Sequence, residues 1–448
     1  MASHGYMCSI IPPYLLESLC NCEDDEVRES AHSTFALQET LHKHRHDLFA
    51  AKCASLGHQH GGHGHHGHGS APQGIVPGAL LEAVSTSDQV DDDTKEAAQK
   101  SLQLSQEVRD DRAAVAVAVA TSDAAVTVSS LAAEAGPEGT ETGFWRGVYD
   151  MKNKGDANKP WTFSLLPGHA VRLEGQAPSK DKAVNEAYDN ALNVLQFYKK
   201  HFNYDSLDNN HMPVKSSVHF GQSLGNAFWL SSSEQMVYGD GNTFIHNFTG
   251  CIDVIGHEMT HAVTQYNSAL EYKDESGALN EHLSDVFGIM VKQMVEDETA
   301  ENADWLIGEG CLLPGVKGVS LRNMKNPGTA YNDPRFGADL QPASVAEVPA
   351  VMAKYGDFIR NRDYGGVHIF SGIPNRAFVL AATAFGGYSW ERAGQVWWKV
   401  VTERRIGKNC TFVQFADATV DAAAELYDAD AAKVVRDAWT QVGVVRTV

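Results

Sequence analysis

The spacing of apolar residues divides the chain into a dense C-terminal part and a sparse N-terminal part. Between Lys182 and His201, apolar side chains recur every three or four residues, which is the period of an amphipathic helix. The rest of residues 144–250 mixes short β-type runs with Gly, Asn and Asp turns. Residues 251–448 are predicted to be mainly helical, with helices at 251–265, 277–296, 371–387, 389–402 and 411–426.

The first 143 residues lack this density. Residues 1–54 contain a Pro12-Pro13 loop followed by leucines at roughly helical spacing, which indicates a small helical segment. Residues 55–143 are of low complexity, with six histidines between His58 and His68 and then Ala, Ser, Val and acidic residues. Such a composition buries too little apolar surface to fold, so we predict a mostly disordered linker. The histidine tract is compatible with binding of divalent metals, and equally with a solvated linker that has no specific function.

Composition and charge exclude several classes of protein. The apolar fraction of 43% and the charged fraction of 21% are ordinary for a soluble globular protein. The net charge of -21 opposes binding to phosphate backbones and acidic membrane surfaces, so we expect no nucleic-acid or membrane partner. The seven cysteines are odd in number and sparse, which favours a reducing compartment over a disulfide framework. The first residues lack a basic segment followed by an apolar stretch, so we expect cytoplasmic synthesis, with export by a non-classical route left open.

One motif carries specific chemistry. His257-Glu258-Met259-Thr260-His261 lies in an apolar run that predicts a buried helix, on which both imidazoles share one face and can reach one ion. Catalytic zinc prefers three protein ligands and a water, and Glu281 on the next predicted helix is a candidate third ligand. Asp285, one turn beyond, can accept a hydrogen bond from a ligand imidazole. The alternative is a chance motif with two ordinary histidines, but the Asn-Glu-x-x-Ser-Asp sequence that follows makes chance a poor explanation.

The same region resembles a known family. Residues 251–291 are similar to the thermolysin family of zinc metalloendopeptidases, whose pattern is H-E-x-T-H followed by a Gly-Ala-x-Asn-Glu-x-x-Ser-Asp helix. At the N-terminus, Ile10-Ile11-Pro12-Pro13-Tyr14-Leu15-Leu16 resembles the short propeptide of protealysin-like members of this family. Shorter blocks of agreement lie at 148–150, 174–176, 185–189, 226–229, 236–241, 320–322 and 365–375.

This resemblance implies a fold and an activity. The fold would be α+β, a thermolysin-like zincin with a β-rich N-terminal lobe, a mainly α-helical C-terminal lobe and the active-site cleft between them. The chain would divide into a propeptide (1–54), the linker (55–143), the N-terminal lobe ending in the zinc helix (144–265) and the C-terminal lobe (266–448). The activity would be hydrolysis of peptides and proteins on the N-terminal side of hydrophobic residues. The propeptide would act as an intramolecular inhibitor that keeps the enzyme latent.

The resemblance also assigns catalytic roles. His257, His261 and Glu281 would hold one zinc ion. Glu258 would take a proton from the zinc-activated water that attacks the peptide carbonyl, and would pass it to the leaving amine. His368 and Tyr272 match the family's hydrogen-bond donors to the developing oxyanion. Asp363 matches the carboxylate that orients the His368 ring.

Substrate contacts follow from the same resemblance. The residues that would bind the substrate backbone are Asn226, Ala227 and Arg322. The residues that would line the apolar pocket after the scissile bond are Val254, Leu321, Ile307 and Phe244. A core-packing role for these four apolar residues is equally compatible with their chemistry.

Two features depart from the family pattern. The loop that follows Trp229 is longer than the pattern, so the rim of the cleft can differ. Lys292 stands where an acidic side chain bridges two calcium ions in the family, while Asp253, Asp304 and Glu309 match the remaining carboxylates. Because an ammonium can replace a cation among three carboxylates, we expect no double-calcium site.

Two other functions are weighed against an endopeptidase. A metal-handling protein would use the histidine tract to buffer zinc or nickel, but metal storage needs none of Glu258, Tyr272, His368 and Arg322. A proteolytically inactive binding protein that keeps the fold is opposed by the complete catalytic set. Cleavage of casein that a chelator blocks would separate these three functions.

Overall fold

The computed structural model describes residues 11–22, 24–25, 27–34, 142–155, 163, 165–230, 233–242, 245–268, 270–335 and 337–445. Almost all of the predicted linker, with its histidine tract, lies outside the described residues. So do the end of the predicted N-terminal helical segment and Phe244 of the predicted pocket.

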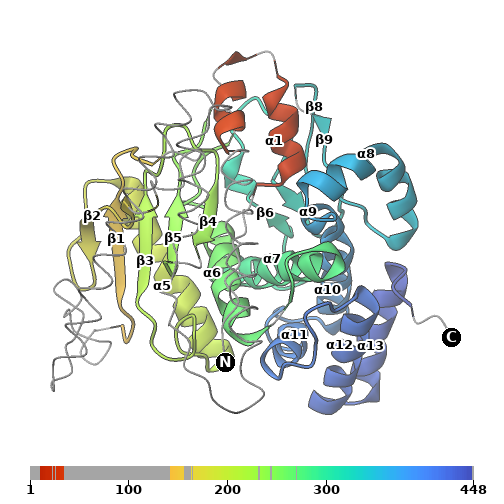
Figure 1. The fold of residues 1–448 in the computed structure, drawn as a ribbon. Helices are drawn as coiled ribbons and strands as arrows, with labels where there is room; N and C mark the ends of the chain where they lie inside the picture. The colour runs from red at the N-terminus through yellow and green to blue at the C-terminus, as the bar shows by residue number, and fades with distance from the viewer. Residues whose placement is uncertain are drawn as a thin grey trace, which may run out of the picture. The chain divides into compact units, whose positions relative to one another are not determined.

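A five-stranded mixed sheet forms the β-containing part of the molecule (Figure 1). Its strands are β1 (Arg146–Asp150), β2 (His169–Leu173), β3 (Val214–Val218), β4 (Ala227–Leu230) and β5 (Gln235–Tyr238), in the spatial order β2-β1-β3-β5-β4. The inner strands β1, β3 and β5 run parallel, whereas β2 and β4 pair antiparallel with β1 and β5. Strand β4 is therefore an edge of the sheet.

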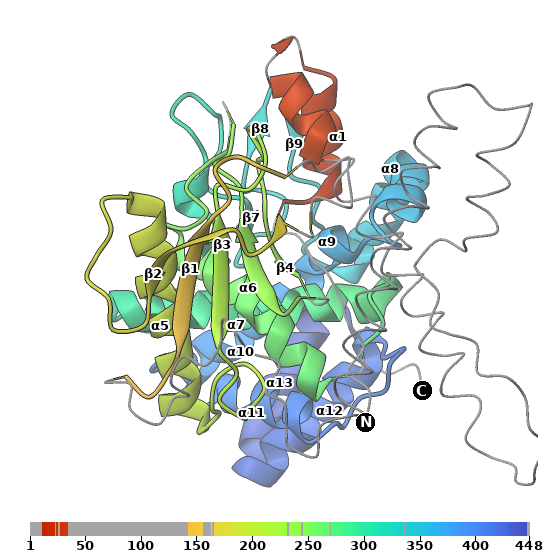
Figure 2. The same ribbon diagram turned by 60° about the vertical axis from the view of Figure 1, so that its left-hand side comes forward.

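Helix α5 (Lys182–Phe202) packs against this sheet and contacts β1, β2 and β3 (Figure 2). Asp181 caps its first turn by accepting a hydrogen bond from the Val184 backbone N–H, at 3.3 Å. Its buried side chains, such as Ala187 and Val194, recur at helical spacing and face the core. The helix predicted between Lys182 and His201 is confirmed.

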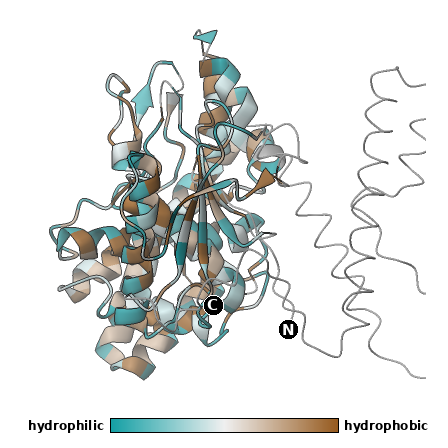
Figure 3. Ribbon diagram, turned by 90° about the vertical axis from the view of Figure 1, so that its left-hand side faces the viewer, coloured by the Kyte–Doolittle hydropathy of each residue, from teal (hydrophilic) through white to brown (hydrophobic). Residues whose placement is uncertain are grey.

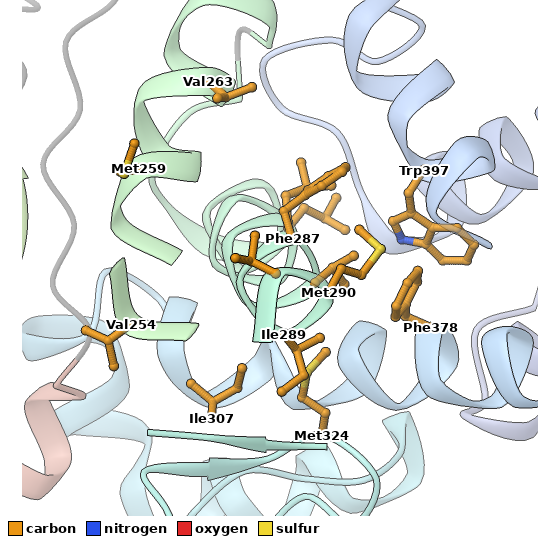
Figure 4. Packing of buried hydrophobic residues seen from close by; sticks show 14 of the residues in the cluster. Val254, Met259, Val263, Phe287, Ile289, Met290, Ile307, Met324, Phe378 and Trp397 are labelled. Carbon is orange, nitrogen blue, oxygen red and sulfur yellow. The ribbon is translucent and has the colours of Figure 1, made fainter. Parts of the chain in front are cut away.

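Helices α6 (Ile252–Asn267) and α7 (Asp274–Glu296) form the centre of the molecule. Every position of α7 between Ser276 and Gln293 is buried, and Figure 4 shows apolar side chains around the whole helix. The two helices approach closely, because a Cβ at Gly288 would lie 2.6 Å from the Asp253 carbonyl oxygen. A glycine at this position therefore lets α6 and α7 pack backbone to backbone, and this contact sets the register between them.

The C-terminal part is helical, as the pattern predicts. The predicted helices at 371–387, 389–402 and 411–426 are confirmed as α10 (Gly372–Phe385), α11 (Ala393–Thr402) and α12 (Phe412–Leu426). Three further helices, which were not predicted, are α8 (Val348–Arg362), α9 (Val367–Phe370) and α13 (Ala429–Gln441). Helix α13 buries Ala431, Val435, Ala438 and Trp439, which recur every three or four residues, so this helix could have been predicted from its apolar spacing. Apolar residues lie mainly where the elements face one another (Figure 3).

Short elements complete the described chain. Strand β6 (Leu306–Ile307) pairs with β7 (Arg322–Asn323), and β8 (Asn332–Asp333) pairs with β9 (Gly337–Ala338). Near the N-terminus, α1 (Pro13–Cys20) begins directly after Pro12. Pro13 is its first residue, a position where proline is tolerated because its missing N–H would have no partner in the helix. No helix among the described residues is both long and apolar enough to cross a bilayer.

Candidate metal centre and catalytic residues

The three predicted metal ligands meet at one point in the core. His257 and His261 lie one turn apart on α6, and Glu281 faces them from α7. The two Nε2 atoms are 3.0 Å apart. Oxygens of Glu281 lie 3.5 Å from Nε2 of His257 and 3.7 Å from Nε2 of His261. All three side chains are buried, and their ligand atoms lie within 4.8 Å of one another.

Hydrogen bonds to the other ring nitrogens fix both imidazoles. Nδ1 of His257 lies 2.8 Å from Oδ1 of Asp285, and Nδ1 of His261 lies 2.9 Å from Oδ1 of Asn280. A carboxylate and an amide oxygen can only accept, so both Nδ1 atoms carry the proton. The Nε2 atoms of both rings therefore point to one place, beside a carboxylate. Two imidazole Nε2 atoms and one carboxylate are the donor set that suits catalytic zinc, so the residues present fit the ion.

Charge balance supports this assignment. Burial raises the pKa of Glu281, but the neighbouring His368 and His261 outweigh burial and lower this pKa to about 2. Burial likewise raises the pKa of Asp285, but Arg322 and His257 outweigh it and hold the pKa below its usual range. Both carboxyl groups are therefore ionised at neutral pH, and neither can donate a proton to a ligand imidazole.

Glu258 lies on α6 between the two histidines and is fully buried. Its Oε2 accepts a hydrogen bond of 3.1 Å from the backbone N–H of Trp229 in strand β4. The carboxylate is thereby tied to the edge strand that the resemblance assigns to the substrate. Asn226 and Ala227, at the start of this strand, are buried too. The structure therefore brings the predicted base and the predicted backbone-binding residues together.

A second group of predicted residues contacts Glu281 or lies next to it. Nε2 of His368, on α9, lies 3.6 Å from Oε2 of Glu281 and 3.3 Å from the hydroxyl of Tyr272. The Tyr272 hydroxyl donates to Oε1 of Glu281. Nδ1 of His368 lies 2.7 Å from Oδ1 of Asp363. Burial lowers the pKa of His368, but Glu281 and Asp363 outweigh burial and raise it, which favours an imidazolium that can donate from Nε2.

The remaining predicted residues are placed as follows. Arg322 donates to both oxygens of Asp285, at 2.8 Å from Nε and 2.6 Å from the terminal nitrogen, so its predicted contact with a substrate carbonyl stays a prediction. Val254, Ile307 and Leu321 are fully buried and belong to the central core. Val254 lies one turn before His257 on α6, Ile307 pairs with Arg322, and Leu321 directly precedes Arg322, so their predicted place in a substrate pocket stays a prediction.

The N-terminal segment forms hydrogen bonds to the body of the molecule around Asp339 and around Gly225. The Tyr14 hydroxyl, on α1, donates to Oδ1 of Asp339 at 3.2 Å. Ser30 donates to the carbonyl oxygen of Ser223 and accepts from Asn242, and the backbone N–H of Gly225 donates to Thr34 at 3.3 Å. The second contact lies directly before strand β4.

The side of α7 that faces the β6–β7 region carries Lys292. Its ammonium lies 3.1 Å from Asp304 and 3.2 Å from Glu309, and it also donates to the Leu306 carbonyl oxygen at 3.4 Å. Burial lowers the pKa of Lys292, but Asp253 and Asp304 outweigh burial and raise it above its usual range. The structure therefore brings the four residues singled out in the sequence together.

Comparison with known proteins decides the family. Residues 140–265 match the family model of the thermolysin metallopeptidase catalytic domain, and residues 268–444 match that of its alpha-helical domain. The chain belongs to the thermolysin family of metallopeptidases. The expected enzyme class and the expected thermolysin-like α+β fold are therefore confirmed.

Relatives of this metallopeptidase include two bacterial proteases. Protease PrtS of a Photorhabdus species is 42% identical over 300 residues, covering 67% of this chain and 76% of the relative. An extracellular metalloprotease of Pectobacterium carotovorum is 46% identical over 281 residues, covering 62% and 78%. Among solved structures, the precursor of protealysin from Serratia proteamaculans is 39% identical, with a TM-score of 0.61 over 83% of this chain and 99% of that chain. The resemblance to protealysin-like members is confirmed.

Several contacts of the metallopeptidase have no counterpart in the sequence reasoning. Asn280 and Ser284 both lie 2.9 Å from Nδ1 of His261. They belong to the Asn-Glu-x-x-Ser-Asp motif, from which only Glu281 and Asp285 were predicted to act at the metal. Asn375 donates to Asp285 at 2.8 Å, and it too lies in a block that was noted without a role. No pattern in the sequence indicates that Tyr14 pairs with Asp339, because 325 positions separate the two residues.

Proposed function

We propose that this metallopeptidase is a zinc-dependent endopeptidase that cleaves peptide bonds on the N-terminal side of hydrophobic residues and is made as a latent zymogen. The observation that carries the proposal is the pair of Nε2 atoms, 3.0 Å apart, that face each other beside Glu281. Glu258 lies between them in the chain and is held at the edge strand. Metal storage would need neither this carboxylate nor the donors beside Glu281.

His257, His261 and Glu281 would hold the zinc ion. When bound, zinc supplies Lewis acidity that polarises a peptide carbonyl and makes a water more acidic. Glu258 accepts a proton from the attacking water at its carboxylate, and it later donates that proton to the leaving amine. The Trp229 N–H, at 3.1 Å, keeps this carboxylate oriented toward strand β4.

The two donors beside Glu281 stabilise the developing negative charge. Nε2–H of protonated His368 and the Tyr272 hydroxyl lie 3.3 Å apart, so both can donate to one oxygen. Such preorganised donors contribute about 3–4 kcal/mol each to transition-state stabilisation. Asp363 keeps the proton on Nδ1 of His368 and directs Nε2 inward. Asn226 and Ala227 would pair with the substrate backbone as an added strand.

The substrate preference rests on three apolar side chains. Val254 precedes the ligand His257 by one helical turn, Ile307 and Leu321 adjoin Arg322, and none of the three side chains has a polar atom. A charged side chain placed against them would lose its hydration without a partner, whereas Leu, Ile, Phe or Val would gain buried apolar area. Matched peptides with Phe or Asp after the scissile bond test this preference. Equal values of kcat/KM for the two peptides would contradict it.

Latency is supported by the seating of the N-terminal segment. Tyr14 contacts Asp339 in the C-terminal half, and Thr34 contacts Gly225 just before the edge strand. The segment thus spans both parts of the molecule while it remains covalently attached. Processing would occur between about residue 50 and residue 143, because exposed polar chain is where proteases cut. N-terminal sequencing of the active form tests this, and a fully active chain with residues 1–54 still bound would contradict it.

Lys292 would take the place of calcium in this enzyme. Its ammonium already lies within 3.2 Å of two carboxylates, and a third carboxylate, Asp253, contributes to its raised pKa. Cytoplasmic synthesis and the absence of nucleic-acid and membrane partners stay predictions from composition. One experiment tests the proposed activity as a whole: hydrolysis of casein that a chelator abolishes and added zinc restores.

A further inference from the structure

We propose that Trp397, His282 and Asn375 form a directed hydrogen-bond relay that positions Asp285 and, through it, the imidazole of His257. The inference rests on the proposed zinc site, because His257 is one of its ligands. Trp397, His282 and Asn375 are positioning residues, since each acts through its neighbour. The relay would set the affinity for the metal from a helix that provides no ligand.

The relay is a continuous line of short contacts. Nε1 of Trp397, on α11, lies 2.8 Å from Nε2 of His282 on α7. Nδ1 of His282 lies 2.8 Å from Oδ1 of Asn375 on α10, and Nδ2 of Asn375 lies 2.8 Å from Oδ2 of Asp285. Nδ1 of His257 lies 2.8 Å from Oδ1 of the same carboxylate. All five side chains are fully buried.

The direction of the relay is fixed at its outer end. An indole N–H can only donate, so Nε2 of His282 must accept from Trp397. A neutral imidazole has one donor and one acceptor, so Nδ1 of His282 carries the proton and donates to Asn375. The amide of Asn375 must then turn its oxygen toward His282 and its nitrogen toward Asp285. Each group thereby determines the orientation of the next.

The consequence appears at Asp285. Arg322 donates to both of its oxygens, and Asn375 adds a donor to Oδ2. The carboxylate is therefore held in one orientation, with Oδ1 directed at the Nδ1–H of His257. If the amide of Asn375 were reversed, its oxygen would face a carboxylate oxygen in a fully buried site, which is strongly unfavourable. Asp285 therefore fixes the direction of the relay at its inner end, as Trp397 does at its outer end.

A simple packing role for Trp397 is the alternative, and the chain offers a matched control for it. Trp439 is buried and stacks on Trp397, with ring centroids 6.2 Å apart and planes 12° apart. Its Nε1 also donates to a buried side chain, Thr419 Oγ1, at 2.9 Å. Trp439→Phe therefore removes the same ring edge and the same kind of hydrogen bond from the same cluster, but it leaves the relay intact.

The test measures the dissociation constant of Zn²⁺ by competition with a chelator. The full chain is used throughout with Glu258→Gln as background, so that it cannot cleave itself. Asn375→Ala should weaken zinc binding about 10-fold, the size typical of residues that support a ligand. Trp397→Phe should weaken it about 3-fold, and Trp439→Phe should leave it unchanged. In the Trp397→Phe, Asn375→Ala double variant, the loss should equal that of Asn375→Ala alone.

A second measurement reads the relay without metal. Nitrogen-15 NMR of histidine-labelled apoprotein should give His282 as the Nδ1–H tautomer in the parent, in Trp439→Phe and in each single variant of the relay, because Trp397 and Asp285 each fix the direction on their own. The Trp397→Phe, Asn375→Ala double variant should lose this tautomer. An unchanged zinc affinity in Trp397→Phe, or the Nδ1–H tautomer retained in the double variant, would overturn the relay. So would full additivity of Trp397→Phe with Asn375→Ala. A parent chain that binds no zinc would instead refute the proposed metal site, and the tautomer measurement would still decide the relay.

Discussion

The substitution of calcium by Lys292 can be tested through its effect on stability. The carboxylates around Lys292 differ in exposure: Asp304 and Glu309 are 37% and 54% exposed, whereas Asp253 is 3% exposed. Exposed pairs contribute about 0–1 kcal/mol each. Breaking a buried pair costs about 3–5 kcal/mol, because one charge is left without compensation.

The two ion pairs of Lys292 are with the partly exposed Asp304 and Glu309, whereas Asp253 acts on the ammonium through its charge. Asp253 keeps the hydrogen bond from the Gly308 N–H, which limits its loss when the ammonium is removed. We expect Lys292→Met to lower the free energy of unfolding by about 2 kcal/mol, because two exposed pairs are lost and a buried carboxylate loses its compensating charge. With an unfolding entropy of about 2.1 cal/mol/K per residue over roughly 300 folded residues, the melting temperature should fall by about 3 °C. The melting temperature of Lys292→Glu should fall further, since this variant adds a fourth carboxylate.

The assay is a thermal melt with zinc held constant and calcium varied. Calcium should barely change the melting temperature of the wild-type protein, and millimolar calcium should partly rescue Lys292→Glu. At a calcium concentration ten times its dissociation constant, the rescue would be about 1.4 kcal/mol. Lys433→Glu is the control, because it makes the same charge change at a side chain that is 71% exposed. A large calcium-dependent rise in the wild-type melting temperature would refute the substitution.

Three further predictions concern catalysis, latency and pH. Glu258→Gln should bind zinc and keep its fold while losing several orders of magnitude of peptide hydrolysis, because the proton shuttle is removed; near-wild-type turnover of the zinc-loaded variant would exclude this role. Tyr14→Phe removes the donor to buried Asp339, so the full chain should become active roughly 5- to 10-fold faster. This is measured as a shorter lag before peptide hydrolysis begins. An unchanged lag would show that this hydrogen bond does not maintain latency. Hydrogen bonding to Asp240 raises the pKa of His219 to about 9. Below pH ~6.5 the free energy of unfolding of the wild-type protein should therefore exceed that of His219→Gln by about 1 kcal/mol. This difference should disappear as the pH rises through about 9. Denaturant melts of both proteins across this range measure the difference, and a constant difference would contradict the assignment.

Sequence reasoning succeeded where one residue type at one spacing determines the outcome. The apolar period predicted α5, which buries one face, and the apolar runs predicted α6 and α7, which are buried on all sides over most of their length. The i, i+4 spacing of His257 and His261 places both rings on one side of a helix whatever surrounds it. The ligands therefore could be predicted from local geometry, given that the next helix returns to the same point.

Contacts between distant segments could not be predicted in this way. Which neighbour Arg322 bonds depends on the packing of β7 against α7, and the structure gives it Asp285. Helix α8, by contrast, could have been predicted locally: its apolar residues recur at helical spacing, and Pro349 lies in the first turn, where proline is tolerated. Tyr14 and Asp339 are paired by a docking surface that a linear pattern does not contain.

The position of α7 predicts that metal binding and stability are linked in this protein. A single buried helix presents Glu281 and Asp285 to α6, His282 to α11 and Lys292 to the β6–β7 region. Its contact with α6 passes through Gly288, where even a methyl group would meet the Asp253 carbonyl oxygen at 2.6 Å. Because the helix has no free side to move into, a shift caused at one of these contacts is transmitted to the others. The ligand geometry is therefore supported by the packing of the whole core, and residues such as Trp397 can influence the metal without approaching it.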